Sequence, residues 1–140
     1  MSYGIKKEVN LNFEEAIIKV KEELKKEGFG VLTEINVKNT LNEKLGINYD
    51  DYIILGACNP SFAYKALQSE KEIGLLLPCN IIVYSQNDKT IISAINPAIA
   101  MSIVENESLK EIASEVGEKL KKVIYSLGDV KGDNKNENRN

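Results

Sequence analysis

Apolar residues recur at two different periods along the chain, and these periods distinguish predicted strands from predicted helices. Alternation of apolar and polar positions predicts strands over residues 3–9, 31–37 and 90–95. An unbroken apolar run over residues 51–58 is typical of a strand buried on both faces. Residues 79–85 predict one more strand, joined to the next by a polar hairpin turn. The pattern therefore indicates a sheet of about five strands.

Helical spacing of apolar residues predicts three helices between and after these strands. The first ends at Gly28, the second is short and begins at Pro60, and the last spans residues 107–127. Residues 39–46 place Leu41 and Leu45 on one face of a short helix, and residues 98–104 form an apolar stretch. Each of these segments predicts a helical turn or a loop.

The order of the main elements is β-α-β-β-α-β-β-α, which contains the split βαβ pattern of a ferredoxin-like sheet, extended by one strand and one helix. We expect a two-layer α+β fold, with a mixed, mostly antiparallel sheet and helices packed on one face. Residues 1–127 are expected to form a single domain. Residues 128–140 are almost entirely polar and predict a disordered tail, since they offer too little apolar surface to bury.

Composition excludes several classes of function. The 140 residues carry a net charge of −3, so neither a nucleic acid nor an anionic membrane is an expected partner. No apolar run reaches the length of a membrane span, and the first residues lack the apolar region of a secretory signal. The chain has no histidine, which excludes a Ser-His-Asp triad. We therefore expect a cytoplasmic protein whose two cysteines are free thiols.

The two cysteines stand in matching contexts, each beside a proline, before an asparagine and at the end of a predicted strand. Cys58 precedes Asn59 and Pro60, and Cys79 precedes Asn80. Cys58 also precedes a predicted helix, whose free N–H groups and dipole favour a thiolate. The candidate ligand-binding residues are therefore Cys58, Asn59, Cys79 and Asn80.

The expected topology brings both thiols to one end of the sheet. If one strand separates Cys58 from Cys79, their backbones stand about 9–10 Å apart, which is too far for a disulfide without movement. Two thiolates are too few for a structural zinc site. A two- or three-coordinate copper(I) site and a four-thiolate site shared across a dimer both stay open, with Cys58 and Cys79 as the metal ligands. The sequence names no cofactor.

Each candidate also has a purely structural interpretation. Cys58 ends a buried strand and Cys79 begins one, so both can serve as small apolar core residues. Glu34, Asp50 and Asp51 are candidates for acid–base chemistry, but their positions are also typical of solvated strand ends.

The segments Leu55–Leu67, with its Gly-Ala-Cys-Asn-Pro element, and Ile73–Asn80, with its Leu-Pro-Cys-Asn element, resemble the domain of unknown function 302 family. The resemblance covers residues 3–127. It implies a small α+β domain that pairs into homodimers and has no established activity. The family has Asp-Pro after the last strand, followed shortly by Met. This chain has Asn96-Pro97 there, so the missing carboxylate argues against acid–base or hard-metal chemistry at that position.

Two functional hypotheses follow. In the first, the protein binds a small ligand, a soft metal or a sulfur species, or has a redox role, at the two-cysteine site. Backbone N–H groups after Asn59 would then hold a small anion or sulfur species. In the second, it is a structural or interaction module that acts through its dimer surface, and both cysteines are core residues. A hydrolase or transferase has the least support, because the sequence shows no general base.

Overall fold

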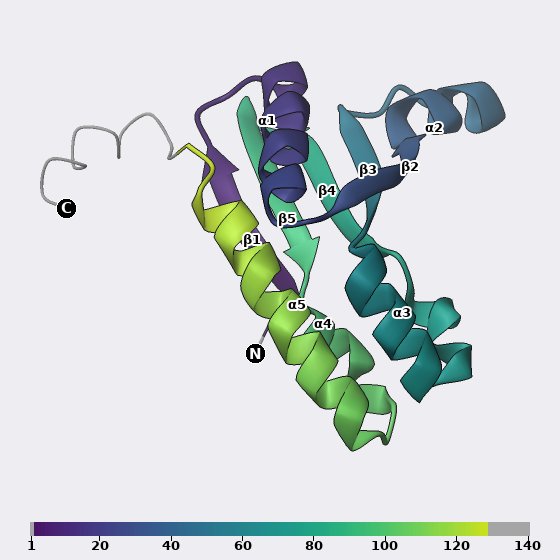
Figure 1. Cartoon of the computed structure of the whole chain (residues 1–140). Helices are drawn as coiled ribbons and strands as arrows, with labels where there is room; N and C mark the ends of the chain where they lie inside the picture. Colours follow the sequence, from purple (N-terminus) through teal and green to yellow (C-terminus); the bar gives the residue numbers. More distant parts are fainter. Residues whose placement is uncertain (1, 129–140) are drawn as a thin grey trace, which may run out of the picture.

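The computed structural model describes residues 2–128, and Figure 1 shows its elements. The tail expected over residues 128–140 lies outside the described residues, apart from Gly128. The elements are, in chain order, β1 (Gly4–Val9), α1 (Phe13–Lys26), β2 (Gly30–Asn36), α2 (Val37–Leu45), β3 (Tyr52–Cys58), α3 (Pro60–Ser69), the 3₁₀ helix η1 (Lys71–Leu76), β4 (Cys79–Gln86), β5 (Lys89–Ile95), α4 (Pro97–Ala100), the 3₁₀ helix η2 (Met101–Ile103) and α5 (Glu107–Tyr125).

The sheet has five strands in the order β1-β5-β4-β3-β2, and each strand is antiparallel to its neighbours. The predicted α+β class is confirmed, but the sheet is wholly antiparallel instead of mixed, and the ferredoxin-like pairing does not occur. Each connection from β2 to β5 returns the chain beside the strand it has just left, so these four strands pair in sequence order. β1 then pairs with β5 at the edge of the sheet. The order of elements along the chain does not determine which strand β1 pairs with.

Local signals explain where the elements start and stop. Asn12 and Glu15 form a capping box at the beginning of α1, each side chain accepting a hydrogen bond from the other's backbone N–H. Gly28 follows that helix with a φ of +88°, the left-handed conformation that a C′ glycine adopts. Asn87 and Asp88 both have positive φ, as the two-residue turn between β4 and β5 requires.

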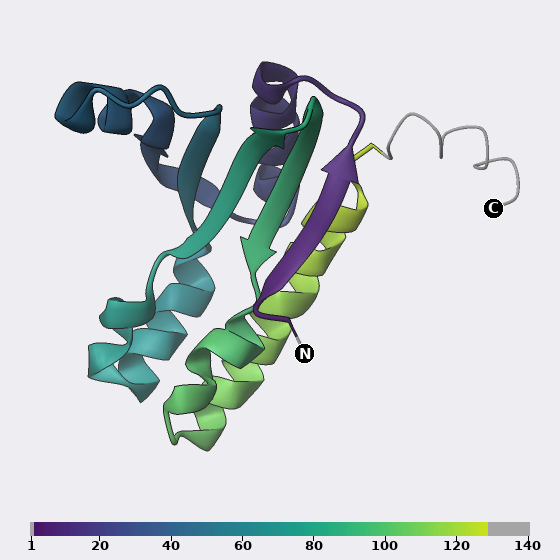
Figure 2. The ribbon, with the colours of Figure 1, turned by 180° about the vertical axis from the view of Figure 1, so that it is seen from behind.

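Helices α1 and α5 cover one face of the sheet, and in the reverse view the strands lie in front of them (Figure 2). Apolar residues of both helices and of the inner strands fill the space between. The largest fully buried members of this main core are Val20, Leu24, Leu55, Ile81, Val83, Ile92, Leu120, Val123 and Ile124.

A second, smaller core lies beyond the end of the strands, where α3, η1, α4 and η2 gather around the first half of α5 (Figure 1). It contains Ala66, Ile73, Met101, Leu109 and Ala113. The stretches predicted as short helical turns or loops are helical in the structure, as α2 and as α4 with η2. Among the described residues, no helix is long and apolar enough to cross a membrane.

Candidate functional site

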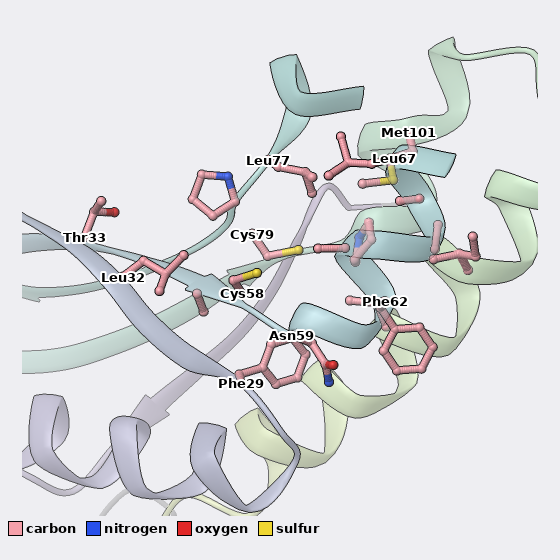
Figure 3. Close-up of a pocket in the computed structure, with 18 residues that line it drawn as sticks. Phe29, Leu32, Thr33, Cys58, Asn59, Phe62, Leu67, Leu77, Cys79 and Met101 are labelled. Atoms are coloured by element: carbon pink, nitrogen blue, oxygen red, sulfur yellow. The ribbon is translucent and has the colours of Figure 1, made fainter. Parts of the chain in front are cut away.

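A pocket of about 350 Å³ opens between the two cores, at the end of β3 and the start of β4 (Figure 3). Its walls combine the strand ends with α3, α4 and α5. The lining residues are Phe29, Leu32, Thr33, Ala57, Cys58, Asn59, Phe62, Ala63, Ala66, Leu67, Leu77, Pro78, Cys79, Pro97, Met101, Ile112, Ala113 and Val116.

Both cysteines line this pocket as free thiols, and Figure 3 shows their sulfur atoms next to each other. No strand separates them, because β3 and β4 are direct neighbours and Ala57 pairs with Cys79. Cys58 is therefore one residue beyond the partner of Cys79. Neighbouring strands about 4.8 Å apart and a step of about 3.3 Å along the strand place the two Cα atoms about 6 Å apart. The separation of about 9–10 Å that an intervening strand would impose does not apply. Because Ala57 shares a face with Cys79, strand alternation turns Cys58 toward the opposite face, so a disulfide still requires movement at the end of β3.

The two thiols differ in environment. Cys79 is only 8% exposed, whereas Cys58 is half-buried. Burial raises the pKa of Cys79 from 9.0 to about 11, and the electrostatic effect of nearby Cys58 makes a smaller contribution to this rise. Cys79 therefore stays protonated at neutral pH. Of the two sulfur atoms, that of Cys58 is the one more open to a reagent from solution.

Asn59 lies between the pocket and the end of α1. It occupies the N-cap position of α3, and Pro60 occupies the first turn, as the sequence predicts. The Asn59 side chain does not cap the helix, however. Its Nδ2 donates a hydrogen bond to the backbone carbonyl oxygen of Glu27, at 3.2 Å. Asn59 thus holds the start of α3 against the end of α1.

Asn80 does not join the other three candidate residues. It is exposed, pairs with Gly56 and follows Cys79 directly along β4, so its side chain lies on the opposite face of the sheet. It lines a second pocket of about 220 Å³, which shares Leu77, Pro78, Cys79, Pro97 and Met101 with the first. The lining of the first pocket therefore includes Cys58, Asn59 and Cys79 but not Asn80.

Several lining residues were not candidates from sequence. Thr33, Phe62 and Pro97 come from three different elements, and only long-range packing makes them neighbours. Phe62 and Met101 carry an ordinary core-like pattern, so no sequence signal distinguishes them.

None of the acidic candidates Glu34, Asp50 and Asp51 lines the pocket, although Glu34 directly follows the lining residue Thr33. Glu34 forms an ion pair with Lys21 at 2.6 Å, and Asp51 one with Lys38 at 3.7 Å, all with partly exposed side chains. Asn96 begins α4, where its Oδ1 accepts a hydrogen bond from the backbone N–H of Ala98. Within residues 2–128 no group of three or more His, Cys, Asp or Glu side chains is placed to hold a metal ion. The sulfur groups in the pocket wall that can bind a soft metal are the two thiols and the thioether of Met101.

Comparison with known proteins agrees with this architecture. No curated protein matches the chain. A solved structure, the uncharacterized conserved protein DUF302 from Bacillus stearothermophilus, is similar with 32% sequence identity and a TM-score of 0.84. The match covers 89% of this chain and 97% of that one. The model of the family described as domain of unknown function DUF302 matches residues 5–127. The chain therefore belongs to the DUF302 family.

Proposed function

We propose that the protein binds a small molecule in the two-thiol pocket, with Cys58 as the group that contacts the ligand chemically. The observation that carries this proposal is the presence of two free thiols from adjacent strands on the wall of one pocket of about 350 Å³. This volume is within the range of small-molecule sites. A cytoplasmic location is part of the proposal, because reducing conditions keep both thiols free.

A soft metal has less structural support as the ligand than a small molecule does. Two thiolates can hold copper(I), but coordination requires Cys79 to lose its proton, and burial opposes that loss. A redox role requires more than the Cα spacing of about 6 Å, because alternation along β3 points the Cβ atoms of Cys58 and Cys79 to opposite faces of the sheet. The end of β3 must therefore rearrange before a disulfide can form. In that reaction the two thiols give two electrons and two protons to a small disulfide, which leaves as two thiols.

Thiol alkylation followed by mass spectrometry tests the role of Cys58. The folded protein is treated with N-ethylmaleimide over a range of pH, with glutathione as the reference thiol. We expect Cys58 to react faster than glutathione and at least about tenfold faster than Cys79, which is buried and protonated. The Cys58→Ser and Cys79→Ser variants assign each modified peptide. A Cys58 that reacts no faster than glutathione would overturn the reactive-thiol proposal.

A second candidate function is an interaction module that pairs with a copy of itself through the uncovered face of the sheet. The register places Ile35, Ile54 and Ile82 in one row across this face. Tyr52 stacks on Tyr84 in the next row, with ring centroids 5.4 Å apart. All of these side chains are exposed or half-buried, and no charged residue occurs in β3 or β4. Such an apolar surface is typical of a protein interface.

Helix α2 supports the same second candidate. It lies beyond the β2 edge of the sheet and contains no buried residue (Figure 1). Isolated helices this short are marginal in water, because packing supplies most of a helix's stability. Contact with a second copy would supply packing for α2 and cover the apolar rows together.

Sedimentation velocity tests the homodimer. We expect the wild-type protein to sediment as a dimer and Ile82→Lys to shift it to monomer, while Ile18→Lys, at a 60% exposed position on α1, leaves the dimer intact. A wild-type protein that stays monomeric at every concentration would overturn this second candidate.

A further inference from the structure

The chemistry of the pocket wall indicates the class of ligand. None of the residues that line the pocket, in the part of the chain that the structure describes, has a charged side chain. We propose that the pocket binds an uncharged, largely hydrocarbon molecule with a volume of up to about 350 Å³. This inference rests on the proposed ligand-binding function and specifies its ligand. It differs from the small anion or sulfur species that the helix N-terminus suggests.

The first argument for an apolar ligand is that the pocket lies between the two hydrophobic cores. Phe29 and Val116 belong to the main core, and Ala66 and Ala113 belong to the smaller one. Protein interiors are close-packed and contain few voids larger than one water molecule. A gap of about 350 Å³ has room for about twelve waters at about 30 Å³ each. An apolar molecule placed here would complete the packing between the two cores.

The identity of the wall residues explains why the gap is open. Ala57, Ala66 and Ala113 are each at most 2% exposed and line the pocket, and their short side chains leave the space between the cores unfilled. Larger aliphatic residues at these positions would close it. The small residues therefore shape a pocket with apolar walls, and pockets lined mainly by apolar side chains are typical of small-molecule sites.

The few polar groups in the wall do not favour an ion. Asn59 already uses its Nδ2 in the hydrogen bond to Glu27, and the Cys79 thiol is buried among apolar residues. Thr33 supplies an uncharged hydroxyl. An ionised ligand would lose its water here without gaining a countercharge, which carries a large free-energy cost. An uncharged ligand avoids this cost and can still contact the half-buried thiol of Cys58.

A displacement assay with two matched competitors tests the inference. N-phenyl-1-naphthylamine, an uncharged dye that fluoresces in apolar surroundings, is the probe, and 1-octanol and octanoate are the competitors at neutral pH. We expect the dye to bind and 1-octanol to displace it at a concentration at least about tenfold below that of octanoate. Absence of dye binding, or equal displacement by the two competitors, would overturn the inference.

Two variants test whether the dye binds in this pocket. Ala63→Leu places a larger side chain at a half-buried lining position, and it should weaken dye binding. Ala98→Leu, at an exposed position on α4, should leave binding unchanged. As a second measurement that needs no variant, 1-octanol should slow the alkylation of Cys58 in the wild-type protein, and octanoate should not. Dye binding that is the same in both variants, with no protection of Cys58, would place the dye elsewhere and overturn the inference.

The assay separates failure of this inference from failure of the proposed function. Dye binding and the alkylation rate of Cys58 are measured independently on the wild-type protein. Dye binding together with an unreactive Cys58 would reject the thiol role and retain the apolar ligand. A reactive Cys58 without dye binding would reject the apolar ligand alone.

Discussion

The side-chain amide of Asn59 donates a hydrogen bond from Nδ2 to the backbone carbonyl oxygen of Glu27, 3.2 Å away. This contact joins the first turn of α3 to the end of α1. Gly28 lies directly against it, and a Cβ atom at Gly28 would come within 3.0 Å of Nδ2. The junction therefore fixes two walls of the pocket, one from Phe29 and one from Cys58.

Replacing Asn59 by alanine should destabilise the protein by about 1 kcal/mol, the net value of a typical hydrogen bond. Urea unfolding at neutral pH measures the change. Asn80→Ala is the matched control, because Asn80 also follows a cysteine but is exposed on β4, and it should change the free energy of unfolding by no more than about 0.5 kcal/mol. Equal effects of the two variants would contradict a structural role for the Asn59 contact.

Gly56 is a second test of packing beside the pocket. A Cβ atom at this position would overlap Thr33 Oγ1 and lie 2.9 Å from Pro78 Cγ. We therefore expect Gly56→Ala to cost about 1–3 kcal/mol in urea unfolding. Gly30→Ala should have little effect, since a Cβ atom there meets open space. Adding Thr33→Ala to Gly56→Ala should recover part of the loss, and its failure to do so would contradict the steric explanation.

Local patterns were enough to predict most of the elements of this fold. The helix stop at Gly28, the start of a helix at Pro60 and the hairpin turn before residue 90 all depend on nearby residues alone. Strand order depends on which distant strands pair. The order of elements along the chain does not show whether β1 lies at the edge of the sheet, as it does here, or between two other strands.

In the candidate site, too, some features depend on nearby residues and can be predicted, whereas others depend on long-range packing. The sequence directs attention to Cys58 and Cys79, and the structure places both in one pocket. Separation of Asn80 from Cys79 follows from strand alternation, which is visible in the sequence once β4 is assigned. The apolar wall could not be predicted, because it forms where two cores approach without merging, and that gap is a property of long-range packing.

Glu23 predicts how acid affects stability. This buried carboxylate accepts hydrogen bonds from Lys26 at 2.9 Å and from Ser126 at 2.9 Å, and it pairs with Lys19 at 3.3 Å. The hydrogen bond from Lys26 is the main reason that the pKa of Glu23 lies below its usual 4.5, with burial acting in the opposite direction. Its contribution to stability is therefore present above pH 4.5 and is lost as the pH falls through the lower folded-state value.

Glu23→Gln should reduce the stability lost by the protein on acidification below pH 4.5, because the titrating group is gone. At neutral pH the same change should cost about 1–3 kcal/mol, since a neutral amide replaces the charged acceptor of Lys26 and Lys19. Urea unfolding at neutral and acidic pH measures both effects. Glu115→Gln, at an exposed position on α5, serves as control and should behave like the wild type. An acid profile of Glu23→Gln identical to that of the wild type would contradict the role assigned to this carboxylate.

The buried thiol of Cys79 predicts a loss of stability in alkali. Burial, with a smaller contribution from Cys58, raises the pKa of Cys79 from 9.0 to about 11, so the folded protein holds this proton more tightly than the unfolded chain does. The corresponding stabilisation is fully present below pH 9 and is lost as the pH rises from about 9 through about 11. A rise of about two units in pKa corresponds to about 2–3 kcal/mol.

Cys79→Ala should therefore lose less stability than the wild type between pH 8 and pH 11 in urea unfolding. Cys58→Ala, which removes the half-buried thiol, should show most of the loss seen in the wild type. If Cys79→Ala loses as much stability as the wild type, desolvation of this thiol does not control the alkaline response.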